Sequence, residues 1–191
     1  NSFSRVVVTR ELTNLPPALW GAHAPFVSDL RPRQRLMAID GMAGTVMREY
    51  SKKEDIEHLK YDVTNIAYFL RSHGGAAVIG VGGGKDILAA LYFGHEKIKG
   101  IELNPIFVDL LKNRFRDFAG LGDDDKVTLV VDEARSYFSH NAEKFSVLQM
   151  SLIDTWASTG AGAFSLSENA LYTLEGWRVF MSRLNDDGVF T

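Results

Sequence analysis

Three consecutive glycines lie in the stretch AAVIGVGGGKDILAAL, residues 76–91, between an apolar run and an amphipathic one. Glycine costs backbone entropy in ordered structure, so this run indicates a tight strand-to-helix turn where the backbone passes close to another group. The alternation continues downstream, with strands expected at 97–103, 126–131 and 145–153 and helices at 105–120, 133–140 and 165–184. Such alternation with short connections predicts an α/β fold, namely a Rossmann-like, doubly wound and mostly parallel sheet. The last helix begins with an expected capping box of Ser165 and Glu168.

Residues 1–50 differ from the rest and predict a small antiparallel β element. It contains a short strand at 5–10 and two extended runs that turn at Asp40-Gly41. A single helical pattern follows at 52–72, with apolar residues at Ile56, Leu59, Val63, Ile66, Ala67 and Leu70. We therefore expect one compact unit, in which the β element at 1–50 joins a ligand-binding, Rossmann-like domain at 51–191.

The two ends of the sequence indicate a fragment of a longer protein. The chain begins without methionine, and it stops at DDGVFT, where the turn Asp186-Asp187-Gly188 has just started an apolar run. We expect the C-terminal strands to be truncated. A fragment also leaves room for membrane segments or further domains outside residues 1–191.

Composition excludes several classes of protein. The 191 residues are 46% hydrophobic and 24% charged, an ordinary balance for a soluble globular domain, and the formal net charge of −3 does not favour a nucleic-acid partner. The absence of cysteine excludes disulfides and thiolate chemistry and fits a reducing, cytoplasmic compartment. No apolar run reaches the roughly 20 residues of a membrane span. The five histidines lack the spacing of a metal site, so no metal is expected.

The glycine loop predicts a ligand at the carboxyl end of its strand. Gly80, Gly82 and Gly84 form G-x-G-x-G, but the dinucleotide pattern needs a sixth-position glycine where this chain has Lys85. That difference favours a nucleoside without a pyrophosphate, chiefly S-adenosylmethionine, over NAD. Glu102 ends the next strand, where a carboxylate can accept hydrogen bonds from both ribose hydroxyls. A plain tight turn with an exposed acid is the alternative.

For the other charged residues near this edge, the sequence allows two interpretations, a ligand contact or a structural role. Asp132 or Glu133 ends the third strand, either to accept the adenine amino group or to begin a helix that its dipole favours. Asp86 is expected to interact with the helix N-terminus rather than with a ligand ammonium group. Lys85 is expected to face solvent rather than a ligand carboxylate.

The sequence resembles the class I S-adenosylmethionine-dependent transferases, and more specifically the spermidine synthases and spermidine-synthase-like proteins. The motifs are VIGVGGG (78–84), GIELNP (100–105), VVDEARSYF (130–138) and SLIDTWASTGAGAFSLSENALYTLEGW (151–177). The likeness covers nearly the whole chain, including LMAIDGMAGTVMREY (36–50), which is similar to a hairpin of that family. The resemblance implies a cytoplasmic protein, and because some members are fused to membrane segments, the cytosolic domain of a membrane-attached protein is the alternative.

The resemblance implies a fold, a donor and a set of donor-binding residues. The fold is the class I methyltransferase fold, and the donor is S-adenosylmethionine or its decarboxylated form. The reaction is aminopropyl transfer to a small amine, and a homodimer is the family's usual assembly. The implied donor-binding residues are Gly80, Gly82, Gly83, Gly84, Glu102, Asp132 and Glu133.

The acceptor side of the family pattern is less complete in this chain. The loop acid that holds the donor's amino group falls on Gly83, with Asp86 the nearest substitute. Of the family's D-x-x-D, the first position is Ser151 and the second is Asp154. The hairpin glutamine falls on Gly44, and Tyr-His-Glu falls on 61–63, where only Tyr61 remains.

Alkyl transfer from a sulfonium mainly requires alignment of the nucleophile and exclusion of water. An attacking amine must also lose a proton, for which Asp154 is the candidate catalytic base, or else a turn acid. Residues 155–165 predict a lid with Trp156 and Phe164 on its underside. The predicted substrate contacts are Tyr61, Asp62 and Trp156, and Tyr68 and Tyr172 are weaker candidates that could instead be packing residues.

Three functions remain open on the sequence alone. The first is a spermidine-synthase-like alkyl transferase, and the second is a methyltransferase on the same fold. The third is a non-catalytic nucleoside-binding domain that regulates an attached membrane portion. An NAD-dependent oxidoreductase is disfavoured by Lys85.

Overall fold

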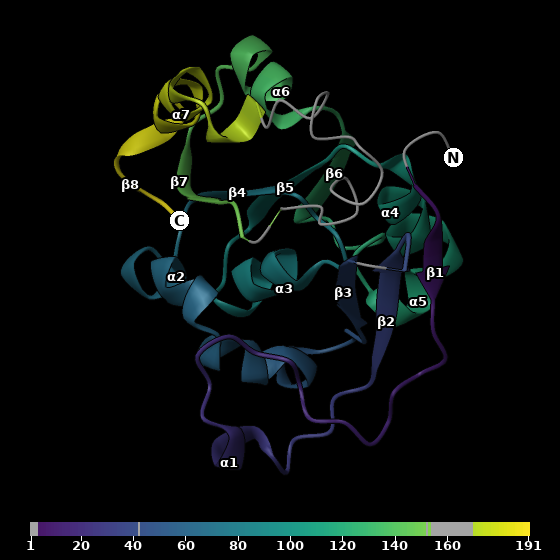
Figure 1. Ribbon diagram of the computed structural model, residues 1–191. Helices are drawn as coiled ribbons and strands as arrows, with labels where there is room; N and C mark the ends of the chain where they lie inside the picture. The colour runs from purple at the N-terminus through teal and green to yellow at the C-terminus, as the bar shows by residue number, and fades with distance from the viewer. Residues whose placement is uncertain (1–3, 42, 152, 154–169) are drawn as a thin grey trace.

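A five-stranded parallel sheet of order β6-β5-β4-β7-β8 organises the chain, and a three-stranded antiparallel sheet of order β1-β2-β3 lies beside it (Figure 1). The computed structural model describes residues 4–41, 43–151, 153 and 170–191. The strands are β1 (Val6–Val8), β2 (Gln34–Ile39), β3 (Ala43–Arg48), β4 (Gly75–Ile79), β5 (Lys97–Glu102), β6 (Val127–Val131), β7 (Phe145–Gln149) and β8 (Leu184–Phe190).

Helices cover both faces of the parallel sheet. The α-helices are α1 (Ala24–Val27), α2 (Ile66–Leu70), α3 (Lys85–Tyr92), α4 (Pro105–Asp109), α5 (Arg116–Ala119), α6 (Ala134–His140) and α7 (Leu174–Met181). In Figure 1, α6 and α7 lie above the sheet and α2 and α3 lie below it. Alternate residues of β4 feed two cores, because Ala76 and Val78 pack on the α3 side and Ala77 and Ile79 on the α6 side. The doubly wound, Rossmann-like fold predicted from the sequence is confirmed.

The chain reverses the direction of sheet growth at β4. It first adds β5 and β6 on one side of β4, then returns to place β7 and β8 on the other side. The carboxyl ends of β4 and β7 therefore flank a topological switch point, where open α/β sheets bind their ligands.

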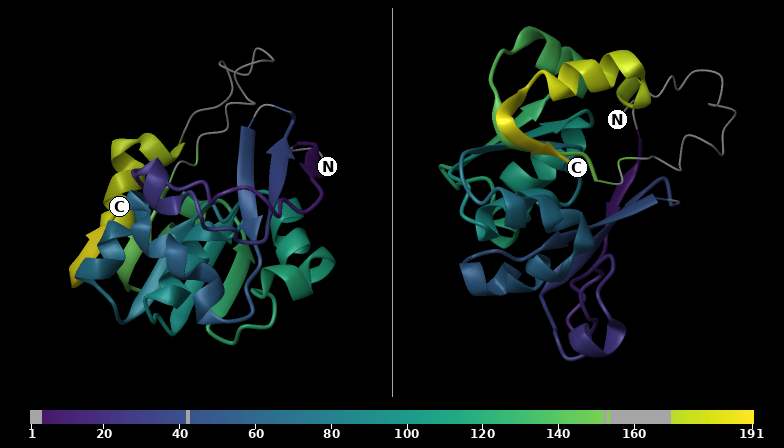
Figure 2. Two further views of the ribbon diagram at one scale, coloured as in Figure 1. Left: turned by 90° about the horizontal axis from the view of Figure 1, so that it is seen from below. Right: turned by 90° about the vertical axis from the view of Figure 1, so that its left-hand side faces the viewer.

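The antiparallel sheet shares a core with the α3 side of the larger sheet and lies along one side of it (Figure 2). Met37 of β2 and Met47 of β3 are fully buried there. The predicted turn between β2 and β3 is confirmed, since Asp40 and Gly41 both have positive φ, 50° and 73°. The domain boundary near residue 50 stays a prediction.

The single helix expected at 52–72 is wrong. The segment forms a 3₁₀ helix at Lys53–Tyr61, a second at Val63–Asn65, and then α2. The break is at Asp62, which has extended backbone and accepts a hydrogen bond from the Thr64 amide, so it starts a new helical turn. Consequently the apolar residues do not share one face: Ile56, Leu59 and Ala67 are buried, whereas Val63, Ile66 and Leu70 are exposed.

Two other predicted helices are also interrupted. The helix expected at 105–120 contains a π-helical segment at Leu110–Arg114 between α4 and α5. The described part of the helix expected at 165–184 is a 3₁₀ turn at Ala170–Tyr172 followed by α7. Thr173 separates them because its hydroxyl oxygen accepts from the Gly176 amide at 3.1 Å and caps α7. The expected capping box of Ser165 and Glu168 lies outside the described residues.

The final strand begins earlier than the sequence predicts. Asp186-Asp187-Gly188 is not a turn before the strand but lies within β8. The register with β7 shifts between Phe145–Leu184 and Val147–Val189, and this irregularity accommodates the acidic residues. Within the part of the chain that the structure describes, no helix is both long and apolar enough to cross a membrane.

Candidate functional site

The glycine loop follows β4 at the switch point, and its backbone amides donate hydrogen bonds to other groups of the protein. Gly80, Gly82 and Gly84 have φ of 78°, 49° and 84°, a region that side chains other than glycine rarely adopt. The amides of residues 80, 82, 83 and 84 donate in turn to Ile101 O (2.9 Å), Glu102 Oε2 (3.0 Å), Thr45 Oγ1 (3.2 Å) and Val81 O (2.8 Å). A phosphate cradle needs free amides, and these four are already bonded.

Glu102 connects the end of β5 to the glycine loop. Its Oε2 accepts from the Gly82 amide at 3.0 Å and its Oε1 from the Asn104 amide at 2.8 Å. The residue is only 8% exposed, and burial raises the pKa of its carboxyl, while backbone amides, that of Asn104 first, act in the opposite direction. The Val81 and Leu103 amides act on the same carboxylate, so the backbone holds it in place at the carboxyl edge of the sheet.

The β2–β3 hairpin covers the glycine loop, a feature that sequence reasoning missed. The Thr45 hydroxyl accepts from the Gly83 amide, and a Cβ at Gly82 would lie 3.1 Å from the same oxygen. A Cβ at Gly83 would lie 2.3 Å from the Val46 carbonyl oxygen. The family's hairpin glutamine falls on Gly44, one residue away, so the resemblance indicates the right strand without identifying Thr45.

The two acids after β6 have different surroundings. Both oxygens of Glu133 accept hydrogen bonds from the first amides of α6, those of Arg135 at 2.9 Å and Ser136 at 2.7 Å. Glu133 is therefore the cap of that helix, one of the two readings left open by the sequence. The Asp132 amide donates to the Glu102 carbonyl oxygen at 3.1 Å, which places Asp132 directly beside Glu102.

A group of charges, three of them buried and Lys85 partly exposed, lies at the start of α3. It consists of Arg48, Asp62, Lys85 and Asp86, called here the charge cluster. Lys85 Nζ donates to Asp62 Oδ2 at 3.2 Å and to Thr64 Oγ1 at 2.9 Å, and lies 3.4 Å from Asp86 Oδ1. The expectation that Lys85 faces solvent is therefore wrong, because its ammonium is directed inward to Asp62, which lies 23 residues earlier, and to the neighbouring Asp86.

The acids of the charge cluster respond differently to Lys85. Burial raises the pKa of both, but for Asp62 the charge of Lys85 and the hydrogen bonds from Thr64 outweigh burial, so its pKa is lowered. For Asp86 burial dominates, and its pKa is raised. Burial also lowers the pKa of Arg48 to about 10, against the attraction of both acids. The guanidinium thus remains charged at neutral pH.

A neutral network joins the charge cluster to the end of β7. Gln149, fully buried, donates through Nε2 to the Thr64 carbonyl at 2.9 Å and to Ser151 Oγ at 2.9 Å, and accepts from the Tyr68 hydroxyl at 2.6 Å. Ser151 in turn hydrogen-bonds Asp86. Tyr68 is therefore a buried packing and hydrogen-bonding residue.

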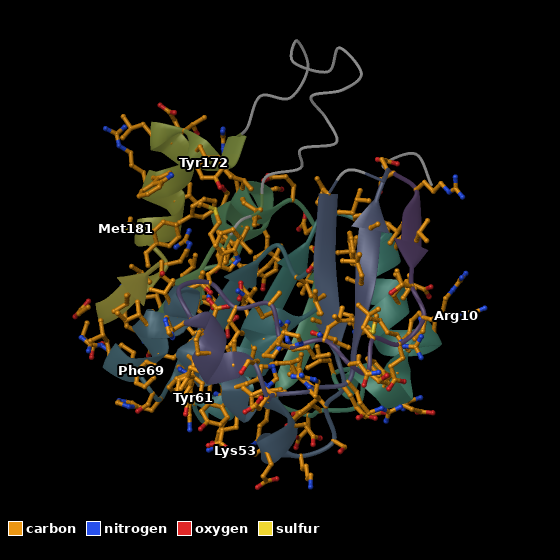
Figure 3. The ribbon with its side chains drawn as sticks, turned by 60° about the horizontal axis from the view of Figure 1, so that its bottom comes forward. Arg10, Lys53, Tyr61, Phe69, Tyr172 and Met181 are labelled. Atoms are coloured by element: carbon orange, nitrogen blue, oxygen red, sulfur yellow. The ribbon has the colours of Figure 1, made fainter. Side chains whose placement is uncertain are left out.

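The remaining predicted site residues are placed apart from the loop or fall outside the described chain. Tyr61 packs edge-on against Phe26, with ring centroids 4.5 Å apart, and lines a groove of about 490 Å³ whose lining does not include the glycine loop. Figure 3 shows Tyr61 and Tyr172 well apart on the surface. Asp154, Trp156 and the predicted lid at 155–165 lie outside the described residues. Across the described ranges, no group of three or more acids and histidines could hold a metal ion.

Comparison with known proteins gives a consistent picture. No family model matches the chain. It is similar to a polyamine aminopropyltransferase from Thermoplasma volcanium, 28% identical over 156 residues, which cover 81% of this chain and 52% of that protein. The chain thus spans about half the length of this relative.

Solved structures agree on the fold. The spermidine synthase from Thermotoga maritima matches with a TM-score of 0.58 and 18% identity, over 85% of this chain and 53% of that one. A spermidine synthase in complex with the transition state analogue AdoDATO gives 0.55 and 19%, over 85% and 52%. Human methyltransferase-like protein 13 in complex with SAH gives 0.52 and 18%, over 70% and 63%. The class I methyltransferase fold is confirmed, and in sequence and fold the chain resembles the spermidine synthases, as its motifs predict.

Proposed function

We propose that the chain is the nucleoside-binding part of an alkyl transferase similar to the spermidine synthases. Its donor is S-adenosylmethionine or decarboxylated S-adenosylmethionine, and its acceptor is a small amine. Aminopropyl transfer, for which the Thermoplasma relative is named, is the first candidate reaction. The observation that carries the proposal is the buried Glu102 carboxylate, hydrogen-bonded to the glycine loop at the carboxyl edge of the sheet.

The residues at this edge fit a nucleoside. The Glu102 carboxylate is an acceptor at this edge, and a vicinal diol such as that of ribose offers two hydroxyl donors to a carboxylate. The loop amides of residues 80, 82, 83 and 84 are bonded within the protein, so they favour a ligand that needs no phosphate cradle. Asp132 lies beside Glu102, where we place the adenine end, with Glu133 contributing through its position at the start of α6.

The bound donor supplies an activated carbon next to its sulfonium sulfur. Residues of this chain then bind the nucleoside, orient it and exclude water, which accounts for most of the rate of such a displacement. Asp154 is the proposed base that takes the proton of the amine, and Trp156, Tyr61 and Asp62 are proposed contacts of the acceptor. A cytoplasmic location and a homodimer accompany the proposal by resemblance alone.

A second candidate is methyl transfer on the same fold. It is favoured by Ser151, which stands where the resemblance implies an acid for an amine substrate and which hydrogen-bonds Gln149 and Asp86 instead. Both candidates need the same nucleoside site, so one binding experiment tests them together.

The experiment is calorimetric titration of the chain with methylthioadenosine, S-adenosylhomocysteine and NADH. We expect the two thioether nucleosides to bind and NADH to give no heat. Glu102→Gln should weaken methylthioadenosine about 10- to 100-fold, because charge-assisted hydrogen bonds are lost. Glu96→Gln is the matched control, since Glu96 is exposed just before β5 begins.

Binding of NADH without the thioether nucleosides would overturn the proposal. An unchanged affinity of Glu102→Gln would remove Glu102 from the site. If the nucleosides bind but no amine is alkylated by either donor in a mass-spectrometric screen of the complete protein, the chain is a non-catalytic nucleoside-binding domain.

A further inference from the structure

Two buried polar atoms in the charge cluster have no hydrogen-bond partner within the described residues, and the second of them has only the ion pair with Lys85 at 3.4 Å. They are Nε of Arg48, which is 2% exposed, and Oδ1 of Asp86, which is 6% exposed. Leaving such atoms unbonded in a low-dielectric interior is costly, so each requires an explanation. One is a cationic donor and the other an anionic acceptor, and a ligand that carries both charges would satisfy the two together.

With all four side chains ionised, the charge cluster has no net charge before any ligand arrives. Arg48 and Lys85 supply two positive charges, and Asp62 and Asp86 supply two negative charges. A ligand group with a single positive charge would leave one buried charge without a counter-ion, which is strongly unfavourable. A zwitterion adds no net charge and keeps the balance.

The position of the charge cluster matches the tail of a nucleoside held at Glu102. The glycine loop contacts Glu102, at the end of β5, through the Gly82 amide and continues to Lys85 and Asp86 at the start of α3. Asp86 then reaches Ser151 just beyond the end of β7. If the ribose lies at Glu102 and the base lies toward β6, the thioether tail extends across the switch point toward the charge cluster.

We propose that the charge cluster is the binding site for the amino-acid tail of the donor, with Asp86 accepting from its ammonium group and Lys85 and Arg48 donating to its carboxylate. This inference rests on the proposed nucleoside site and goes further by naming the donor. Lys85 favours S-adenosylmethionine over its decarboxylated form, because its ammonium would pair with a carboxylate that only the intact tail carries. The decarboxylated tail keeps the ammonium and lacks the group that Lys85 and Arg48 would bind.

The test compares three nucleosides that share one neutral thioether. Methylthioadenosine has no charged tail, S-adenosylhomocysteine has the full amino-acid tail, and its decarboxylated counterpart has the ammonium alone. On the unmodified protein, calorimetry should show S-adenosylhomocysteine binding at least 10-fold more tightly than the decarboxylated compound. This comparison needs no variant, so it decides the matter even where a substitution impairs folding.

Variants then assign the preference to Lys85. Lys85→Met should lose at least 10-fold in affinity for S-adenosylhomocysteine and change methylthioadenosine less than about 3-fold, whereas Lys85→Arg should keep most of the preference. Lys97→Met is the matched control, because Lys97 is exposed at the first residue of β5.

Equal binding of the two tailed compounds, or tighter binding of the decarboxylated one, would overturn the inference while leaving the nucleoside site intact. Tighter binding of the decarboxylated compound by Lys85→Met with S-adenosylhomocysteine unchanged would also overturn it, since Lys85 would then merely compete with a ligand ammonium. Failure of all three nucleosides to bind would refute the proposed function itself.

Discussion

Gly83 is the position at which a single methyl group tests the contact between the hairpin and the glycine loop. Its φ lies outside the left-handed region, so alanine there meets no backbone strain. A Cβ would instead lie 2.3 Å from the Val46 carbonyl oxygen, 2.5 Å from its carbonyl carbon and 2.8 Å from the Met47 nitrogen. All three atoms belong to the backbone of β3, so no flexible side chain can move aside.

The size of the effect follows from what must move. Relief requires displacing β3, which is paired along its length with β2. Overpacking of this kind costs about 1–3 kcal/mol and occasionally more. Gly→Ala also removes conformational freedom from the unfolded chain, which returns about 0.4–1 kcal/mol. Because the clash is with backbone, the cost lies at the upper end of that range, and we expect a net loss of about 2 kcal/mol in the free energy of unfolding.

Urea denaturation of Gly83→Ala measures this loss, and Gly44→Ala on the same strand is the control. A Cβ at Gly44 would meet the end of the Leu36 side chain at 3.2 Å, which can adjust, so that variant should stay within about 0.5 kcal/mol of the wild type. If Gly83→Ala proves as stable as Gly44→Ala, the hairpin does not rest on the loop in solution and the contact is refuted.

Two further predictions concern the same region. Thr45→Val leaves the Gly83 amide without its acceptor, so it should lower the free energy of unfolding by about 1–2 kcal/mol and weaken the binding of methylthioadenosine several-fold by calorimetry. Thr128→Val, at an exposed position, should change neither quantity. Burial, and then the charge of Arg48, lowers the pKa of His58 to about 4 from 6.5, so the unfolded chain binds more protons and stability falls as the pH is lowered from about 6.5 to 4. The loss amounts to about 3 kcal/mol. In His58→Gln this part of the pH dependence of the urea midpoint should disappear, and in the exposed His73→Gln it should persist.

The fold and the ribose side of the site could be predicted because they depend on local pattern. Strand-helix alternation determines where parallel strands end, and Glu102 ends the strand after the glycine loop, so the sheet brings the two together. The helix interruptions at Asp62 and Thr173 were not predicted, although both are capping residues that accept from an amide two or three positions later. Along the sequence, the hydrophobic residues keep a nearly helical spacing across each break. Apolar periodicity therefore predicted continuous helices and gave no sign of the interruptions.

The charge cluster could not be predicted, because only tertiary contacts bring Arg48 and Asp62 to the adjacent pair Lys85-Asp86. Arg48 ends the hairpin strand, Asp62 separates two 3₁₀ helices, and Lys85 begins α3. For a lysine after a glycine run, no sequence signal shows whether its ammonium group faces solvent or pairs with a buried carboxylate. Its inward direction depends on Asp62, 23 residues earlier, whose side chain is fully enclosed.

The position of the hairpin explains why the acids of this chain differ from those of the spermidine synthase pattern. The family's loop acid falls on Gly83, and the Val46 carbonyl oxygen occupies the space that any side chain at that position would need. An aspartate therefore cannot be restored there without moving β3. The carboxylates of this chain lie instead at Asp62 and Asp86, and each is paired with Lys85. A site built for a bare ammonium would leave its acids available, whereas this one places a cation between them. The same substitutions that weaken the match to a polyamine site thus form a balanced set of charges, and a balanced set suits a ligand that brings a carboxylate together with its ammonium.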